Sequence, residues 1–166
     1  MIEVTLETIQ ISLVSSHRIV VLKEPESERY LPIWIGPCEA ESISVGVKGI
    51  DTPRPLTHDL MVNILDALDA RLSYVYINDL ADNTFFATLL VEAGGVDVEI
   101  DARPSDAIAI AVRTGVPIYV SENVLAEAGI EPEQDLLRQG TPGSENLGVF
   151  RDFLSSLDLD DSHETG

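Results

Sequence analysis

The apolar segment Ala107–Val112 is the feature that most constrains what this chain can fold into. It lies within Ser105–Thr114, a stretch that follows a proline and predicts a helix with apolar residues on every side. A helix of this kind cannot lie on a surface, because each of its faces would expose hydrocarbon to water. We therefore expect a domain whose other elements surround this central helix.

The remaining elements follow from two periodicities. Apolar residues that recur every three or four positions predict helices, whereas alternation of apolar and polar residues predicts strands. The predicted strands are 2–13 with a bulge or bend near Glu7–Thr8, 17–23, 30–35, 73–79, 84–91, 96–101 and 117–120. The predicted helices are 37–48, 57–70, 105–114, a short one from 121 to 129, and a last one that begins at 144. This mixture indicates an α+β fold.

Three expectations concern local structure. Segment 37–48 fits a strand pattern as well as a helix pattern, and Pro37 and Gly49 favour the helix. Thr57 is expected to be the N-cap of helix 57–70. In strand 96–101 the apolar residues are expected to point inward and the acidic residues outward; the apolar set is Val96, Val98 and Ile100, and the acidic set is Asp97, Glu99 and Asp101.

The aromatic residues and the single cysteine receive structural interpretations. Base stacking needs exposed rings on a basic surface, and the sequence shows no basic surface. We therefore expect the rings in the core or in cross-strand pairs; they are Trp34, Tyr74, Tyr76, Phe85 and Phe86. Cys38 has no partner pattern that would support a nucleophile, so we expect a packed thiol.

The length of 166 residues suits one domain with a short appendage. We predict a domain over residues 1–130, a C-terminal helical extension over 131–157, and an acidic, disordered tail over 158–166. The extension is amphipathic, with an apolar set of Leu147, Phe150, Phe153, Leu154 and Leu157.

The charge balance is strongly acidic. The chain has 29 acidic and 10 basic residues, a formal net charge of −19. The acidity is spread over the whole chain, so the field repels phosphate backbones and anionic lipid surfaces and argues against nonspecific nucleic-acid binding in dilute salt. A halophile's cytoplasm with molar salt would screen this charge; an ordinary acidic mesophile protein explains it equally well.

The compartment is expected to be the cytoplasm. A lone cysteine forms no intramolecular disulfide, which suits a reducing environment. The N-terminus has strand-like alternation and no basic segment of a signal peptide, and no apolar run approaches the ~20 residues that span a membrane. We expect no membrane partner.

Two stretches carry the candidate chemistry. In each, an Arg-Pro pair stands just before a helix that opens with a hydroxyl residue and an acidic residue; they are 53–59 and 101–106. Free N–H groups at a helix N-terminus and a nearby guanidinium can hold a phosphate. The candidate phosphate-binding residues are Arg54, Arg103, Thr57 and Ser105. Salt bridges to neighbouring carboxylates are the structural alternative for both arginines.

The same stretches offer candidates for catalysis and metal binding. His58 could act as a general base or donate a proton to a leaving group, or it could be a histidine held by a local hydrogen bond. Asp59, Asp101 and Asp106 could act as catalytic carboxylates and hold Mg²⁺ or Mn²⁺, which prefer oxygen ligands. Helix capping and salt bridges are the alternative for these aspartates.

A weak internal echo links 33–40 with 99–107. Each is a strand, a proline turn and an acid–alanine pair that opens an apolar helix. A strand–helix duplication and a coincidence both explain it; under duplication, Glu39 would join the site.

The chain resembles the bifunctional nuclease family over roughly residues 1–130. Four motifs carry the resemblance in order and spacing: Leu31–Gly36 with Glu39 and Ala40, Arg54–Leu60, Asp101–Ala107, and Pro117–Val120. The resemblance implies an α+β fold with a largely antiparallel sheet, a homo-oligomer, and nuclease activity on DNA and RNA.

Two functions of different classes remain open at this stage. The first is a phosphodiesterase that uses the arginines, the aspartates with a divalent ion, and His58 as the proton carrier. The second is a non-catalytic module, in which the same polar cluster binds a small anion or stabilises the fold and the last helix mediates self-association.

Overall fold

The computed structural model describes residues 1–11 and 18–131. Residues Met1–Ile130 form a compact unit. The predicted extension beyond residue 131, the acidic tail, and the last helix lie outside the described residues, so their predictions stand as they were made.

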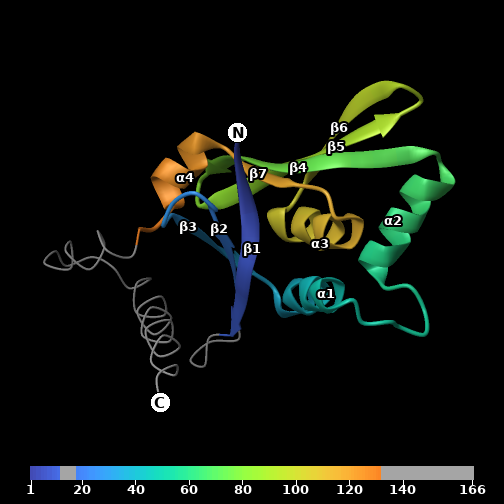
Figure 1. Ribbon diagram of the computed structural model, residues 1–166, viewed down its shortest axis with the longest axis horizontal. Helices are drawn as coiled ribbons and strands as arrows, with labels where there is room; N and C mark the ends of the chain where they lie inside the picture. The colour runs from blue at the N-terminus through green and yellow to red at the C-terminus, as the bar shows by residue number, and fades with distance from the viewer. Residues whose placement is uncertain (12–17, 132–166) are drawn as a thin grey trace, which may run out of the picture. The chain divides into compact units, whose positions relative to one another are not determined.

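The compact unit is built on a seven-stranded sheet with the order β3-β2-β1-β7-β4-β5-β6 (Figure 1). The strands are β1 (Ile2–Ile11), β2 (Arg18–Lys23), β3 (Tyr30–Ile35), β4 (Ala70–Ala81), β5 (Thr84–Ala93), β6 (Val96–Ala102) and β7 (Ile118–Val120). Among the described strands, only the β4–β7 pair is parallel. The α+β fold and the largely antiparallel sheet are thereby confirmed.

Strand β1 belongs to both halves of the sheet. Its first residues pair with β7, and its later residues pair with β2. The register shifts between Leu6 and Thr8, which confirms the irregularity predicted there. Because a bulge bends and twists a strand, this shift lets β1 turn from one half of the sheet to the other.

The described helices are α1 (Pro37–Lys48), α2 (Thr57–Ala67), α3 (Pro104–Thr114) and α4 (Glu122–Ala128). Helix α3 lies at the centre, where α1, α2 and strands β4 and β5 pack against it (Figure 1). Residues Ala107–Ala111 are at most 1% exposed, which confirms the central helix. The helical interpretation of segment 37–48 is also confirmed, and α1 ends at Gly49 with the left-handed backbone that glycine favours.

Helix α2 differs from its prediction. Its N-cap is Leu56, and Thr57 is its first helical residue, so the capping role predicted for Thr57 is wrong. Asp59 supplies the cap from inside the helix, because its carboxylate accepts a hydrogen bond from the Leu56 backbone N–H at 2.8 Å. Part of the apolar stripe of α2 is exposed; the exposed residues are Leu60, Met61 and Ile64, and Leu68 beyond the last turn.

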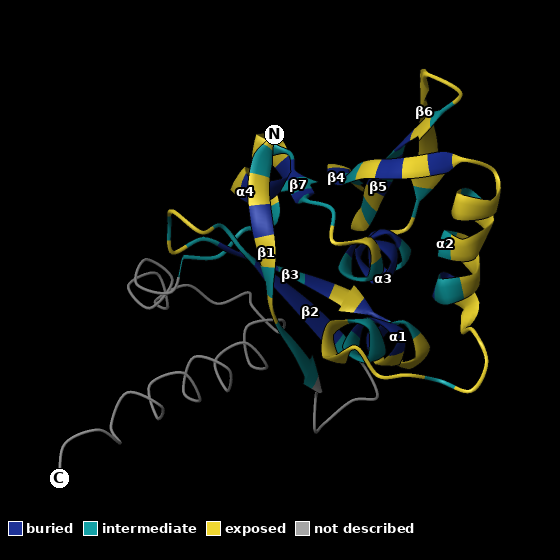
Figure 2. Cartoon of the chain, turned by 45° about the vertical axis from the view of Figure 1, so that its right-hand side comes forward, coloured by how far each residue is buried: buried dark blue, intermediate teal, exposed yellow. Residues whose placement is uncertain are grey.

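Strand β6 also differs from its prediction. Val96, Val98 and Ile100 are exposed, so their predicted inward orientation is wrong. In the described part of the sheet β6 is an edge strand that pairs only with β5, and Figure 2 shows exposed residues along its length. The alternating pattern correctly predicted the strand, but within residues 1–11 and 18–131 its apolar face is exposed.

Three further residues are more exposed than expected. Trp34 on edge strand β3 and Phe86 on β5 are exposed at 43% and 40%. Trp34 points outward between two buried residues, and Phe86 points outward between a half-buried and a buried residue. Cys38 is an exposed thiol rather than a packed one. Tyr74 does form a cross-strand pair, an edge-to-face contact with Tyr119 at a centroid distance of 5.5 Å.

No helix among residues 1–11 and 18–131 is long and apolar enough to cross a bilayer.

Candidate functional site

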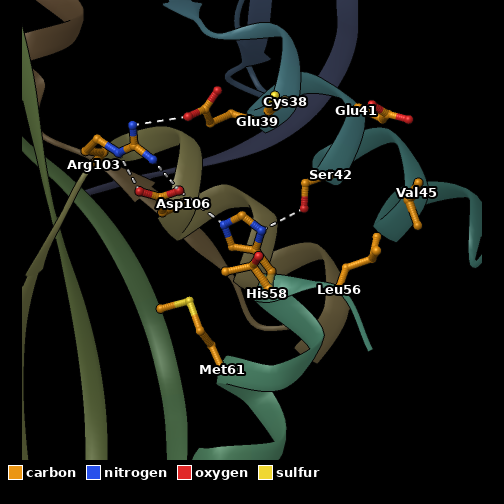
Figure 3. A pocket seen from close by; sticks show the side chains of 11 residues that line it. Cys38, Glu39, Glu41, Ser42, Val45, Leu56, His58, Met61, Arg103 and Asp106 are labelled. Carbon is orange, nitrogen blue, oxygen red and sulfur yellow. Dashed lines mark hydrogen bonds and ion pairs between the residues drawn. The ribbon is translucent and has the colours of Figure 1, made fainter. Parts of the chain in front are cut away.

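An open pocket of about 580 Å³ lies where α1, the start of α2 and the start of α3 meet (Figure 3). Its lining includes the polar residues Glu39, Glu41, Ser42, Thr57, His58, Arg103 and Asp106. Each helix contributes side chains from its N-terminal half, so the pocket depends on the packing of α1 and α2 against the central helix.

His58 is the centre of the polar network in this pocket. Its Nδ1 lies 2.7 Å from Ser42 Oγ, and its Nε2 lies 3.1 Å from Asp106 Oδ1. An ionised carboxylate only accepts hydrogen bonds. In the neutral ring, Nε2 therefore carries the hydrogen and donates a hydrogen bond to Asp106. Nδ1 is then the acceptor, and the Ser42 hydroxyl donates to it. The three side chains form a serine–histidine–aspartate relay.

Asp106 is held in its ionised form. Burial of its carboxyl opposes ionisation, but the hydrogen bonds from Arg103 and His58 outweigh burial and lower the pKa of Asp106 below its ordinary value. Arg103 donates to it through Nε at 2.6 Å and Nη2 at 3.0 Å, a bidentate pair.

Arg103 also joins the first turns of two helices. Its Nη1 lies 3.1 Å from Glu39 Oε1, so the guanidinium bridges Glu39 of α1 and Asp106 of α3. Both acids are the third residue of a helix that begins with proline, as the internal echo between the two segments requires. Glu39 therefore joins the cluster. The two segments are therefore alike in structure, and duplication and coincidence both still explain the likeness.

Asp59 lies outside this pocket, although it follows His58 directly. Its Oδ1 accepts a hydrogen bond from Arg113 Nε at 2.5 Å, while its other oxygen caps α2. The Arg113 guanidinium and the Leu56 N–H lower the pKa of Asp59. The Arg113 side chain is 7% exposed, and its Nη2 is buried without an acceptor among the described residues. This pair holds α2 against α3.

Of the other predicted site residues, one lines the pocket and the rest do not. Thr57 is exposed and lines the pocket, and its role in phosphate binding stays a prediction. Ser105 is buried in the first turn of α3 and does not line the pocket. Arg54 is exposed in the loop before α2, outside the pocket lining. Asp101 is exposed on β6, also outside the lining.

The predicted metal ligands do not converge. Asp59 faces Arg113, Asp101 lies on β6, and both oxygens of Asp106 already bind His58 and Arg103. Within residues 1–11 and 18–131, no group of three or more histidine, cysteine or acidic side chains could hold a metal ion. The aspartates predicted for Mg²⁺ or Mn²⁺ therefore do not fit such an ion as they stand.

The pocket is acidic on balance. Glu39, Glu41 and Asp106 line it, whereas Arg103 is the one cation among the described lining residues when His58 is neutral. Arg103 offsets part of this charge, and its side chain is 65% exposed, so it can still reach a ligand from the solvent side.

The sequence interpretation missed one residue of the polar network in the pocket, and it also missed the arginine of the neighbouring α2–α3 contact. Ser42 lies on the inward side of α1, sixteen residues before His58. A buried polar residue on an apolar helix face was the available signal, but the sequence could not show which side chain it would meet. Arg113 at the end of α3 carried no motif.

Comparisons with known proteins agree with the motifs quoted above. The family model of the bifunctional nuclease domain matches residues 20–133. An uncharacterised protein of Mycobacterium tuberculosis is 41% identical over 98% of this chain and 99% of its own length. Bifunctional nuclease 2 of Oryza sativa subsp. japonica is 30% identical over 68% of this chain, and bifunctional nuclease 2 of Arabidopsis thaliana is 28% identical over 79%. The matches cover 35% and 41% of those two plant proteins.

Proposed function

This chain belongs to the bifunctional nuclease domain family, and from that premise we propose that it hydrolyses phosphodiester bonds of DNA or RNA in the pocket between α1, α2 and α3. The observation that carries the proposal is the position of His58, which lies between Ser42 and Asp106 at hydrogen-bond distance on the pocket wall. Plant relatives named bifunctional nuclease support the substrate class.

The residues divide the work by their chemistry. His58 is the proton carrier, and the ionised Asp106 stabilises the imidazolium that forms when His58 accepts a proton. Arg103 binds a non-bridging phosphate oxygen with the N–H groups that Asp106 and Glu39 leave unused. The first N–H groups of α2, at Thr57 and His58, have no acceptor within the helix and favour negative charge at the same mouth.

The acidic field sets the conditions for activity. The chain has a net charge of −19, and its pocket is rich in carboxylates. A polyanionic substrate is therefore repelled as it approaches. Molar salt shortens the Debye length to ~3 Å and removes this barrier. We expect cleavage of an oligonucleotide to be faster in molar salt than in dilute salt, the reverse of the trend for basic nucleases.

The test is cleavage of a labelled single-stranded oligonucleotide by the purified chain and by His58→Ala. Replacing His58 removes the proton carrier, so the rate should fall by ~10² to 10⁴-fold. Equal cleavage by the variant would contradict the proposal and indicate a contaminating nuclease. An EDTA arm tests Mg²⁺ or Mn²⁺ dependence, which the placement of the aspartates does not support.

The homo-oligomer stays a proposal, and the exposed apolar surface of α2 is the place where it can be tested. The predicted contact through the last helix lies outside the described residues. The described chain instead exposes apolar residues on α2, of which Ile64 is 48% exposed. Sedimentation of the chain and of Ile64→Asp would show whether this face is covered by a second copy.

A further inference from the structure

The Ser42 hydroxyl is hydrogen-bonded to the one ring nitrogen of His58 that can accept a proton. Nε2–H is donated to Asp106, so only Nδ1 has a free lone pair, and Ser42 Oγ lies 2.7 Å from it. A water molecule could give its proton to His58 directly only after displacing Ser42. The proton that this arrangement is built to move is therefore the proton of Ser42.

Ser42 is also placed unlike an ordinary helical hydroxyl. Serine and threonine inside helices often bond the carbonyl four residues earlier, as Thr114 does with Ile110 O at 3.0 Å. Ser42 instead reaches across to a histidine on another helix, and it does so from the wall of the pocket (Figure 3). Arg103, on the far side of Asp106, can hold a phosphate at the same opening.

We propose that Ser42 is the nucleophile of this pocket and that hydrolysis passes through a nucleotide esterified to Ser42 by its phosphate. This inference rests on the proposed phosphodiesterase function. It differs from direct attack by water, which would need Ser42 only as a neighbour of His58.

The step balances without any further reactant. The Ser42 oxygen attacks phosphorus while its proton moves to His58 Nδ1, and the Oγ–P bond forms as the bond to one nucleoside oxygen breaks. His58 returns the proton to that leaving oxygen, which departs as an alcohol. Water then attacks phosphorus and gives a proton to His58; the Oγ–P bond breaks, and His58 returns the proton to Ser42. One water is consumed, and the second product is a phosphate monoester.

The experiment follows the configuration at phosphorus in the unaltered chain. The probe is a thymidine para-nitrophenyl phosphorothioate of one configuration, hydrolysed in heavy-oxygen water. Two successive in-line displacements give overall retention at phosphorus, whereas direct attack by water gives inversion. Retention is the expected result. Inversion would overturn the role of Ser42 and leave the phosphodiesterase standing, whereas no hydrolysis of either this probe or the matching phosphate diester would overturn both.

A second measurement locates the intermediate. Rapid acid quenching during turnover of the thymidine para-nitrophenyl phosphate diester, followed by digestion and mass spectrometry, should find thymidylate on the peptide that carries Ser42. Ser42→Ala should lose the adduct and at least ~10³-fold in kcat/KM. Ser44→Ala, on the same helix and outside the pocket lining, is the matched control and should keep both. An adduct on another residue would contradict the assignment.

Discussion

His58 and Asp59 are neighbours in the sequence, yet they contact opposite ends of α3: His58 contacts Asp106 near its start, whereas Asp59 contacts Arg113 near its end. On the pocket side, His58 meets Asp106, whose partner Arg103 is 65% exposed. On the packing side, Asp59 meets Arg113, which is 7% exposed. The same residue types thus serve a solvent-accessible site on one side of α2 and a helix contact on the other. Burial, rather than residue type, separates the two roles.

The largest expected effect is on the pocket side. Asp106→Asn removes the carboxylate that keeps the proton on His58 Nε2, so Nδ1 becomes protonated and no longer accepts from Ser42. By analogy with the loss of the aspartate in serine-protease triads, the cleavage rate should fall by ~10³ to 10⁴-fold.

Asp101→Asn is the matched control, because Asp101 is exposed on β6 and does not line the pocket. It should cleave at nearly the wild-type rate. If Asp101→Asn lowered the cleavage rate as much as Asp106→Asn does, the result would favour the cluster of catalytic aspartates that the sequence predicted.

The second effect is on stability and belongs to the packing side. Arg113→Ala leaves Asp59 without its ion partner and should lower the free energy of unfolding by about 2 to 4 kcal/mol in urea titrations. Arg103→Ala removes a largely exposed arginine and should cost about 1 kcal/mol or less, while cleavage falls sharply. A large loss of stability in Arg103→Ala together with a small loss in Arg113→Ala would contradict the comparison.

A smaller effect tests how closely α1 approaches Arg113. An added Cβ at Gly46 would lie 2.8 Å from Arg113 Nη1 and 2.8 Å from a Val112 methyl. Alanine is normally the better helix former, but here the collision should dominate and lower stability by about 1 to 2 kcal/mol. In the Arg113→Ala background the penalty should shrink, which a double-mutant cycle in urea would measure. An unchanged penalty would show that Val112 alone causes it.

The smallest effect is a pH dependence. The pKa values of Asp59 and Asp106 are lowered in the folded chain, so the unfolded chain binds more protons at acidic pH. Their contribution to stability is present above the ordinary aspartate pKa of about 3.9 and is lost as pH falls through the folded values. Arg113→Ala should flatten this acid loss in urea titrations between about pH 5 and 2. An equally steep loss in the variant would exclude Asp59 as its source.

Periodicity predicted the elements of the described fold well, because a helix or strand needs only the right spacing of apolar residues. The central helix and the bulge in β1 were predicted in this way, whereas segment 37–48 was predicted as a helix from Pro37 and Gly49 at its ends, because its apolar spacing fits a strand as well. Exposure was harder to predict. The apolar residues of α2 and β6 form their elements as expected, but whether another layer covers them depends on the fold as a whole.

The candidate site was predicted in part, and the limit has a physical cause. His58, Asp106 and Arg103 were named as site residues because they flank helix starts, and the structure brings them together. Ser42 in the pocket and Arg113 in the α2–α3 contact were missed, since their partners lie 16 and 54 residues away in the sequence. Asp59 and Asp106 are each the third residue of a helix, so only the way each helix packs decides which of them faces the pocket.

The most direct test of the central claim is where a substrate analogue binds. A crystal structure with a dinucleotide whose scissile ester oxygen is replaced by methylene would show this. We predict its phosphonate in the pocket, with an oxygen on the Arg103 guanidinium and phosphorus facing Ser42 Oγ beside His58. A phosphonate bound outside this pocket, for example at Arg54 in the loop before α2, with the His58–Ser42 relay facing empty solvent, would contradict the account.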